Sequence, residues 1–202
     1  MIILGLTGSV GMGKTETARM FAELGIPVFD ADRAVHDLYG PGGAAVPLIE
    51  TAFPGVTRDG KIDRALLAER VLDDPDAIAR LEAIVHPLVR KLQRQFIDEA
   101  RSAGADLVVL DIPLLFETRG EANVDKVVVV TAPEHVQRQR VLARPGMTES
   151  KLNSILARQM PDSEKRRRAD FFVETDKGFE HARGQVRQIV ATIRAEANQE
   201  RS

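Results

Sequence analysis

The sequence predicts an α/β fold in three layers, with a sheet of about five parallel strands lying between helices. Short, almost purely apolar runs recur along the chain, which is typical of strands buried on both faces of a parallel sheet. Helical patterns separate these runs, and such alternation indicates a covered parallel sheet. The chain has 202 residues, 44% hydrophobic and 29% charged, which suits one globular domain with an insertion.

Five apolar runs are the expected strands. They are residues 2–7, 26–29, 107–110, 127–131 and, more weakly, 171–173. A helix is expected to begin at Lys14, because apolar residues follow at helical spacing and Gly25 stands where a C-cap belongs. The last helix is expected over residues 179–193, where apolar residues again recur at helical spacing.

The long interval between the second and third strands shows no strand pattern. Helices are expected instead over residues 64–72 and 78–96. Because this interval follows the carboxyl end of a strand, we interpret it as a helical insert that binds substrate, although it could merely cover one face of the sheet. We expect a single domain, residues 1–202. Its core comprises residues 1–34, 104–136 and 169–202, its insert residues 35–103 and its lid residues 137–168.

Charge and composition limit the classes of partner. The formal net charge is −2 and the isoelectric point is near 6.1, so no global attraction to nucleic acid or an anionic membrane is expected. The absence of cysteine excludes disulfides and thiolate metal sites. The first residues lack both the basic segment and the long apolar run of a signal peptide or membrane span. We therefore expect a cytoplasmic protein.

A glycine-rich loop carries the strongest chemical signal. Residues 8–15 read G-S-V-G-M-G-K-T and match G-x-x-x-x-G-K-[ST] between an expected strand and an expected helix. Glycines let backbone amides wrap phosphates, Lys14 adds positive charge, and Thr15 offers a hydroxyl to Mg²⁺. The prediction is a P-loop NTPase fold that binds ATP. A plain turn is the alternative, and a dinucleotide fingerprint is disfavoured because Glu16 occupies the place of its third glycine.

Acidic residues favour a kinase over other P-loop proteins. No N-K-x-D guanine signature occurs, and the D-x-x-G at residues 37–40 follows no strand end, which weakens a GTPase interpretation. If the chain is extended after the second strand, Asp30 and Asp32 project to the same side. Asp32 is the candidate base for the attacking hydroxyl, with Asp30 as its partner or an outer ligand to Mg²⁺. Alternatively, Asp32 is only the N-cap of a helix that begins near Arg33.

A third acid and a basic segment complete the candidate site. Asp111 ends the third strand, where it could position Mg²⁺ through water or cap the following turn. Arg140 and Arg144 are four residues apart, on one face of a helix that Pro145 and Gly146 should end. With Arg158 they could form a lid over the nucleotide phosphates. For the remaining arginines of this segment, a solvated helical face is the better interpretation.

Taken together, the motifs resemble the dephospho-coenzyme A kinase family over nearly the whole chain. The blocks that carry the resemblance are GLTGSVGMGKT, VFDADRAVHDLYGPGG, DGKIDRALLAERVLDDPDAIARLEAIVHPLVR, VVLDIPLLFE and ARQMPDSEKRRRADF. The resemblance implies a kinase that uses ATP and Mg²⁺ to phosphorylate the ribose 3′-hydroxyl of dephospho-coenzyme A, a small-molecule substrate. It implies no nucleic acid or membrane partner, and the chain is expected to be a monomer or a small homo-oligomer.

Site residues follow from the same resemblance. ATP is expected at Gly11, Met12, Gly13, Lys14, Thr15, Glu16 and Arg144, and catalysis at Asp32, Lys14 and Arg140. The acceptor is expected at Asp30, Asp32, His86, Pro113, Leu114, Glu117 and Arg158, and the metal at Thr15 and Asp111. Two departures occur: Pro145 replaces the aspartate of the family's R-D-G, and Thr175 stands where the family has asparagine. A nucleoside or nucleotide kinase, or an ATP-dependent switch, are the competing functions.

Overall fold

The computed structural model describes residues 1–72 and 74–199 and divides into two compact units. One unit comprises Met1–Phe29 and Ala100–Ser202, and the other comprises Asp30–Glu99. Residue 73 of the expected insert and residues 200–202 of the expected core lie outside the described residues.

The sheet consists of five strands in the order β2-β5-β1-β6-β7, so the predicted fold class is confirmed. The strands are β1 (Ile2–Thr7), β2 (Val28–Asp30), β5 (Leu107–Asp111), β6 (Lys126–Thr131) and β7 (Phe171–Glu174). β1 pairs in parallel with β5 and β6, and β6 pairs in parallel with β7. Since β1 lies at the centre, the loop that follows it emerges at the middle of the carboxyl edge.

One strand begins later than the sequence predicts. The N–H of Ile26 donates to the carbonyl of Phe21 at 3.3 Å and so belongs to the end of the preceding helix. Gly25, with φ of 75°, makes the left-handed turn that this helix end requires, as predicted. Pro27 has no N–H to donate to a neighbouring strand. The strand therefore starts at Val28 instead of Ile26.

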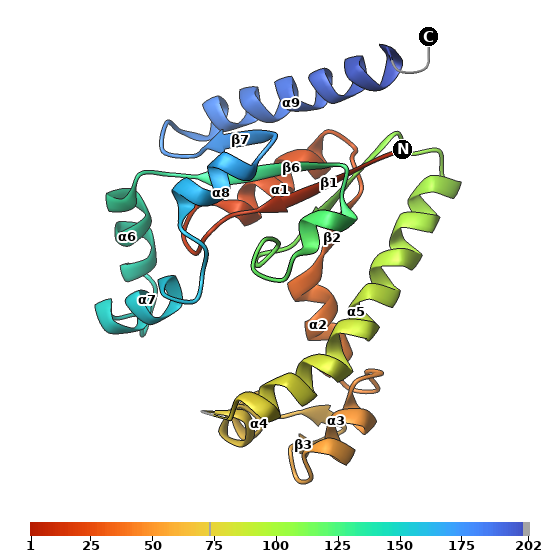
Figure 1. Cartoon of the computed structure of the whole chain (residues 1–202), viewed down its shortest axis with the longest axis vertical. Coiled ribbons are helices and arrows are strands. Elements are labelled where there is room, and N and C mark those ends of the chain that lie inside the picture. The colour runs from red at the N-terminus through yellow and green to blue at the C-terminus, as the bar shows by residue number, and fades with distance from the viewer. Residues whose placement is uncertain (73, 200–202) are drawn as a thin grey trace. The chain divides into compact units, whose positions relative to one another are not determined.

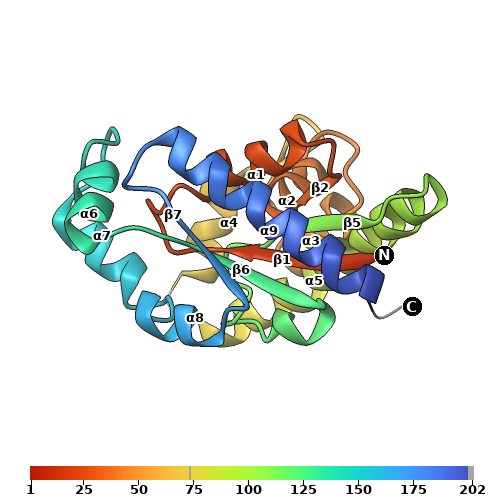
Figure 2. The ribbon, with the colours of Figure 1, turned by 90° about the horizontal axis from the view of Figure 1, so that it is seen from above.

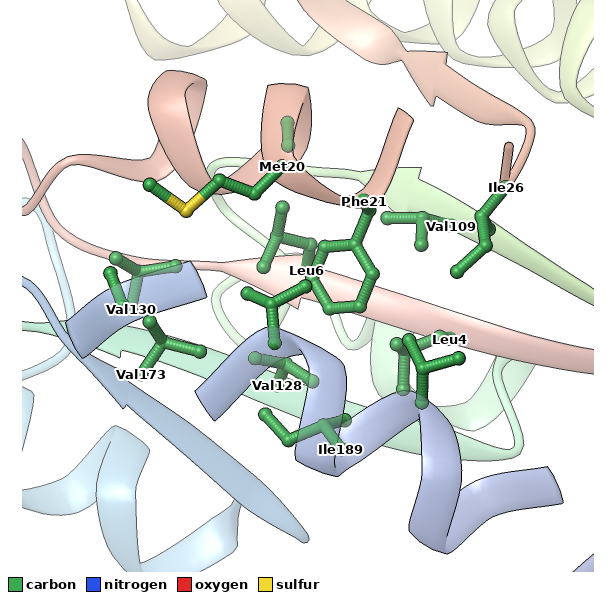
Figure 3. Close-up of a cluster of buried hydrophobic side chains, with 14 of the residues drawn as sticks. Leu4, Leu6, Met20, Phe21, Ile26, Val109, Val128, Val130, Val173 and Ile189 are labelled. Carbon is green, nitrogen blue, oxygen red and sulfur yellow. The ribbon is translucent and has the colours of Figure 1, made fainter. Parts of the chain in front are cut away.

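Helices cover one face of this sheet and share a core with it. The helices of this unit are α1 (Lys14–Glu23), α6 (Glu134–Leu142), α7 (Glu149–Leu156), α8 (Asp162–Arg168) and α9 (Phe179–Gln199). Helices α1 and α9 lie side by side on the sheet (Figures 1 and 2). Figure 3 shows Phe21 of α1 and Ile189 of α9 packed among Leu6 and Val128 of the strands. Burial of these side chains fixes where α1 begins, and thus where the P-loop ends.

The opposite face of β6 has its own cluster. Alternate residues Val127 and Val129 pack with Leu115 and Phe116 from the turn that follows β5. A 3₁₀ turn, Gly120–Asn123, completes that connection, and α8 contacts β6. The sheet is thus covered on both sides, which explains why its strands are apolar at successive positions.

The second unit is mainly helical but contains a hairpin that the sequence does not predict. Its helices are α2 (Ala31–Tyr39), α3 (Val46–Ala52), α4 (Arg64–Val71) and most of α5 (Pro75–Ser102). The strands β3 (Thr57–Arg58) and β4 (Lys61–Ile62) pair antiparallel. Asp59 and Gly60 both have positive φ and form the two-residue turn. Strands of two residues are too short to show the alternation of apolar and polar residues that identifies a strand. The Asp-Gly pair of the turn is the local sequence signal for this hairpin.

This unit has a separate core, formed around Leu38, Ile49, Phe53 and Val56.

Among residues 1–72 and 74–199, no helix is both long and apolar enough to cross a membrane.

Candidate active site

The P-loop lies between β1 and α1, as the motif predicts. Gly11 and Gly13 have φ of 79° and 94°, conformations that glycine adopts without strain. Gly13 is the N-cap of α1, and no side chain caps this helix. The first N–H groups of a helix have no partner within it and carry partial positive charge. The start of α1 therefore offers several donors to an anion.

Lys14 and Asp111 form an ion pair at this loop. Lys14 Nζ lies 2.5 Å from Asp111 Oδ1, and the two side chains are 16% and 6% exposed. Parallel pairing of β1 with β5 brings the carboxyl ends of both strands to one edge, although the residues are 97 positions apart. The structure thus brings two predicted site residues together and places a positive charge beside the unpaired amides.

The oxygen donors near this pair fit a magnesium ion. Thr15 is an exposed residue in the first turn of α1 and carries a hydroxyl, and Asp111 supplies a carboxylate. Among the described residues, no three His, Cys, Asp or Glu side chains gather as a metal-binding cluster. Magnesium needs no such cluster, because in nucleotide sites it takes one or two protein ligands and completes its shell with phosphates and water.

Arg140 holds the P-loop to the segment that follows β7. Its Nη1 donates to Thr175 Oγ1 at 2.8 Å and more weakly to the Gly11 carbonyl at 3.5 Å, and Nη2 donates to the Thr175 carbonyl at 2.8 Å. Thr175 Oγ1 in turn donates to the Met12 carbonyl at 2.7 Å. Met12 is buried, with its sulfur accepting from the Ala132 N–H at 3.1 Å. Arg140, Gly11, Met12 and Thr175 thus form one continuous network.

Arg144 does not share a helical face with Arg140, which corrects the sequence prediction. Helix α6 ends at Leu142, and Arg144 lies in the following turn, exposed to solvent. A residue before proline is disfavoured in the helical conformation, so Pro145 ends the helix before Arg144 rather than after it. Arg158 is likewise exposed, in the turn after α7.

The two aspartates after β2 also differ from their expected arrangement. Asp30 is the N-cap of α2, and its Oδ1 accepts from the Arg33 N–H at 2.9 Å. Asp32 lies in the first helical turn and is exposed. The chain is therefore not extended at Asp32, and the capping role belongs to Asp30. Aspartate is among the preferred N-cap residues, and Asp30, the first of the two aspartates, caps the helix, which begins at Ala31.

The expected acceptor residues have varied surroundings. His86 is exposed on α5, one residue before Pro87, which lies inside that helix. The carbonyl of Pro113 accepts from Thr7 Oγ1 at 3.0 Å, which ties the turn after β5 to the end of β1. Leu114 of the same turn is 41% exposed. His86 belongs to the second unit, and the other two residues to the first.

Glu117 forms a buried ion pair that the sequence does not reveal. Its Oε1 lies 2.9 Å from Nζ of Lys165, which has no exposed surface, and accepts from the Met160 N–H at 2.8 Å. Burial would raise the pKa of the Glu117 carboxyl, but the hydrogen bonds from Lys165 and Met160 outweigh it and lower this pKa below its usual 4.5. The pair braces α8 against the turn after β5.

We expect Glu117→Gln to lower the free energy of unfolding by about 3–5 kcal/mol near neutral pH, because the Lys165 ammonium loses its countercharge. The lowered pKa makes this stabilisation fully present above the usual value of 4.5, and it is lost as the pH falls through the folded-state pKa. Denaturant unfolding at several pH values should therefore show the two proteins converging in acid.

Glu164→Gln is the matched control. Glu164 is on α8 and pairs with Arg167 and Arg168, which are exposed. Surface pairs of this kind contribute little to the free energy of unfolding, because solvent screens them. Equal losses in Glu117→Gln and Glu164→Gln would contradict a bracing role for the buried pair.

A cavity of about 580 Å³ adjoins the P-loop in the first unit. Its lining includes Ser9 of the loop, Thr131 at the end of β6, and Asp162 and Arg166 of α8. Thr131 Oγ1 donates to Asp162 Oδ2 at 2.6 Å, which closes one wall. This volume is typical of small-molecule sites, so the loop has ligand-sized space beside it.

Two glutamines contact the P-loop and were not among the predicted site residues. Gln137 and Gln159 both hydrogen-bond to the backbone of Val10. Gln159 lies in the ARQMPD block of the sequence, which was one available signal, whereas nothing in the pattern of α6 distinguishes Gln137.

Comparisons with known proteins agree with this geometry. The family model for dephospho-CoA kinase matches residues 2–181. A dephospho-CoA kinase of Mesorhizobium japonicum is 61% identical over 196 residues, which are 97% of this chain and 98% of that protein. The crystal structure of TT1252 from Thermus thermophilus is 34% identical with a TM-score of 0.82, over 95% of this chain and 96% of that one. A dephospho-CoA kinase from Campylobacter jejuni, 23% identical, shares the fold with a TM-score of 0.64 over 95% and 96% of the two chains.

Proposed function

Because the chain belongs to the dephospho-CoA kinase family, we propose that its P-loop and the acids assigned below carry out phosphoryl transfer from ATP. The reaction moves the γ-phosphoryl group of ATP to the ribose 3′-hydroxyl of dephospho-coenzyme A, and the products are coenzyme A and ADP. This is the last step of coenzyme A biosynthesis. The observation that carries the assignment to residues is the uncapped start of α1 beside the Lys14 and Asp111 ion pair.

The P-loop binds the phosphates of ATP in this proposal. Backbone N–H groups at Gly11, Gly13 and the start of α1 donate to phosphate oxygens, supported by the helix dipole. Lys14 exchanges its contact with Asp111 for one with the transferring phosphoryl group, whose negative charge it stabilises. A preformed arrangement of donors costs little reorganisation when charge develops in the transition state.

Thr15 and Asp111 hold Mg²⁺ with the nucleotide in the same proposal. When bound, the ion neutralises charge on the phosphoryl oxygens. The Thr15 hydroxyl and the Asp111 carboxylate are a suitable oxygen ligand set for this ion, and Lys14 pairs with the same carboxylate in the structure.

Asp32 is proposed as the base that accepts the proton of the 3′-hydroxyl. A kinase needs a carboxylate that receives this proton and orients the hydroxyl in line with the γ-phosphate. Asp32 is exposed at the start of α2 and makes neither the capping contact of Asp30 nor the ion pair of Asp37. It is therefore the acid of this helix start that is available for a substrate.

The rest of the assignment concerns the lid and the acceptor. Helices α6 and α7 are proposed as the lid, where Arg140, Arg144 and Arg158 contact ligands. The helical unit is proposed to bind the coenzyme, with Asp30, His86, Pro113 and Leu114 on the acceptor side. For Glu117, its two contacts in the interior favour a bracing role, and direct contact with the acceptor stays a prediction. A cytoplasmic monomer or small homo-oligomer completes the proposal.

Arg140→Lys is expected to lower kcat/KM for ATP by about tenfold or more, because lysine keeps the charge but cannot make the forked contacts to Thr175 and Gly11. Arg138→Lys is the control on the same helix, since Arg138 pairs with Glu149 at the surface. Steady-state kinetics should show it within about twofold of the original protein. Equal effects of the two variants would contradict a specific role for the contacts of Arg140 with Thr175 and Gly11 in the use of ATP.

The function is tested by ADP formation from ATP and Mg²⁺ with dephospho-coenzyme A as acceptor. We expect turnover to require both substrates, to yield coenzyme A, and to stop when excess chelator removes the metal. ADP formation that continues unchanged without dephospho-coenzyme A would contradict the proposed function.

A further inference from the structure

The Val10 peptide group of the P-loop is held on both sides by glutamine side chains. Its N–H donates to Gln159 Oε1 at 3.1 Å, and its carbonyl accepts from Gln137 Nε2 at 2.8 Å. Gln137 comes from α6 and Gln159 from the turn after α7, so both belong to the proposed lid segment. Gln137, Val10 and Gln159 are together called the Val10 clamp.

The chemistry of the backbone fixes how each glutamine is oriented. A backbone N–H can only donate, so Gln159 must present its amide oxygen. A backbone carbonyl can only accept, so Gln137 must present its amide nitrogen. Gln159 therefore accepts a hydrogen bond and Gln137 donates one. A carboxylate can accept in place of Gln159, but it cannot donate in place of Gln137.

Packing around the clamp leaves little freedom on the Gln137 side. Gln137 is 4% exposed, so loss of its hydrogen bond would leave a buried polar group unpaired. A Cβ on Gly11 would lie 2.5 Å from Val141 Cγ2 and 3.2 Å from the Gln137 carbonyl oxygen. Helix α6 thus packs directly against the loop, so a shift of the helix would displace the backbone of the P-loop.

Side chains hold three successive carbonyls of the loop. Gln137 donates to the carbonyl of Val10, Arg140 to that of Gly11, and Thr175 to that of Met12. In a planar trans peptide, each carbonyl points opposite to the N–H of the next residue. Fixing the carbonyls of Val10 and Met12 therefore directs the N–H groups of Gly11 and Gly13 to the other side of the loop. These are two of the donors assigned to the phosphates.

We propose that Gln137 and Gln159 are positioning residues, which clamp Val10 and thereby keep the P-loop amides oriented for ATP. The inference rests on the proposed role of this loop in ATP binding. It adds that the proposed lid segment orients the backbone of the loop, so that nucleotide affinity depends on the two hydrogen bonds to Val10. Both glutamine side chains also line the cavity beside the loop. No covalent step is involved.

The test introduces the same charge at both positions. Gln159→Glu keeps an oxygen acceptor for the Val10 N–H, whereas Gln137→Glu replaces the donor by an oxygen that faces the Val10 carbonyl. We expect the dissociation constant for ATP with Mg²⁺, measured calorimetrically without acceptor, to rise by about tenfold or more in Gln137→Glu and to stay within about threefold in Gln159→Glu. Both variants add one carboxylate beside the same peptide, but position 137 is the more buried, so the cost of burying a charge adds to the loss of the hydrogen bond there.

Methionine variants remove charge from the comparison. Gln137→Met and Gln159→Met are expected to weaken ATP binding by about tenfold, so that at position 159 glutamate rescues what methionine loses. Thermal unfolding confirms that each variant is folded, and Gln137→Met decides the outcome at that position if Gln137→Glu does not fold. Equal ATP affinities in the two glutamate variants, or lower thermal stability with unchanged ATP affinity in the methionine variants, would overturn the proposal. Since the measurement needs no acceptor, failure of the clamp is distinguishable from failure of the kinase assignment.

Discussion

Asp32→Asn is expected to lower kcat for coenzyme A formation by about 10²–10⁴, because general base catalysis contributes that range and an amide cannot take up the proton. The dissociation constant for ATP should stay within about threefold, since Asp32 is assigned to the acceptor hydroxyl and not to the phosphates. Stopped-flow or quenched-flow measurement of a single turnover separates the chemical step from product release, and calorimetry gives the ATP affinity.

Asp37→Asn is the matched control for this substitution. Asp37 is an exposed acid on the same helix, where it pairs with Arg33 at 3.0 Å. It receives no role in the proposal, so the rate should change by less than about twofold. A single-turnover rate for Asp32→Asn equal to that of Asp37→Asn would remove Asp32 from the mechanism and leave the P-loop assignment standing.

Lys14→Met is expected to lower kcat/KM for ATP by about 10²–10³, the usual cost of losing one charged donor at a developing negative charge. Methionine keeps much of the length of the side chain, so the loop should remain packed. The substitution also removes the ammonium that pairs with the Asp111 carboxylate, which is only 6% exposed. Lower stability should therefore accompany the loss of activity, and denaturant unfolding measures it.

The double variant Lys14→Met with Asp111→Asn separates these two effects. Asp111→Asn also removes the buried negative charge that Lys14 neutralises, so stability should recover relative to Lys14→Met alone. Activity should not recover, because the ammonium that contacts the phosphoryl group is still missing and a ligand for Mg²⁺ is lost as well. Recovery of activity together with stability would mean that Lys14 acts only as a structural partner of Asp111.

Local sequence signals account for much of the fold. Apolar runs identified all five strands of the sheet, because strands covered on both faces must be apolar throughout. The P-loop could be predicted because its backbone requires glycine at fixed positions, here Gly11 and Gly13. The hairpin around Asp59 was missed because two-residue strands carry no periodicity, although its Asp-Gly turn is a local signal.

Contacts between distant positions could not be predicted in this way. Lys165 begins a run of four basic residues and looks no different from its neighbours, yet its side chain is fully buried against Glu117. Gln137 and Gln159 reach Val10 across 127 and 149 positions. Their roles depend on how α6 and the turn after α7 pack on the loop. Two helix ends also differ from the prediction. Helix α2 begins at Ala31 because Asp30 is its N-cap, and α6 ends at Leu142 because Pro145 disfavours a helical conformation at Arg144.

We conclude that this chain phosphorylates dephospho-coenzyme A, a claim that can be tested with an acceptor competition in a single mixture. The purified protein would receive ATP, Mg²⁺ and equal concentrations of dephospho-coenzyme A, adenosine, AMP and shikimate, and mass spectrometry would identify each phosphorylated product. We predict that coenzyme A is the dominant product and that its formation accounts for the ADP released. Preferential phosphorylation of adenosine, AMP or shikimate, or ADP release with no phosphorylated acceptor, would contradict the claim.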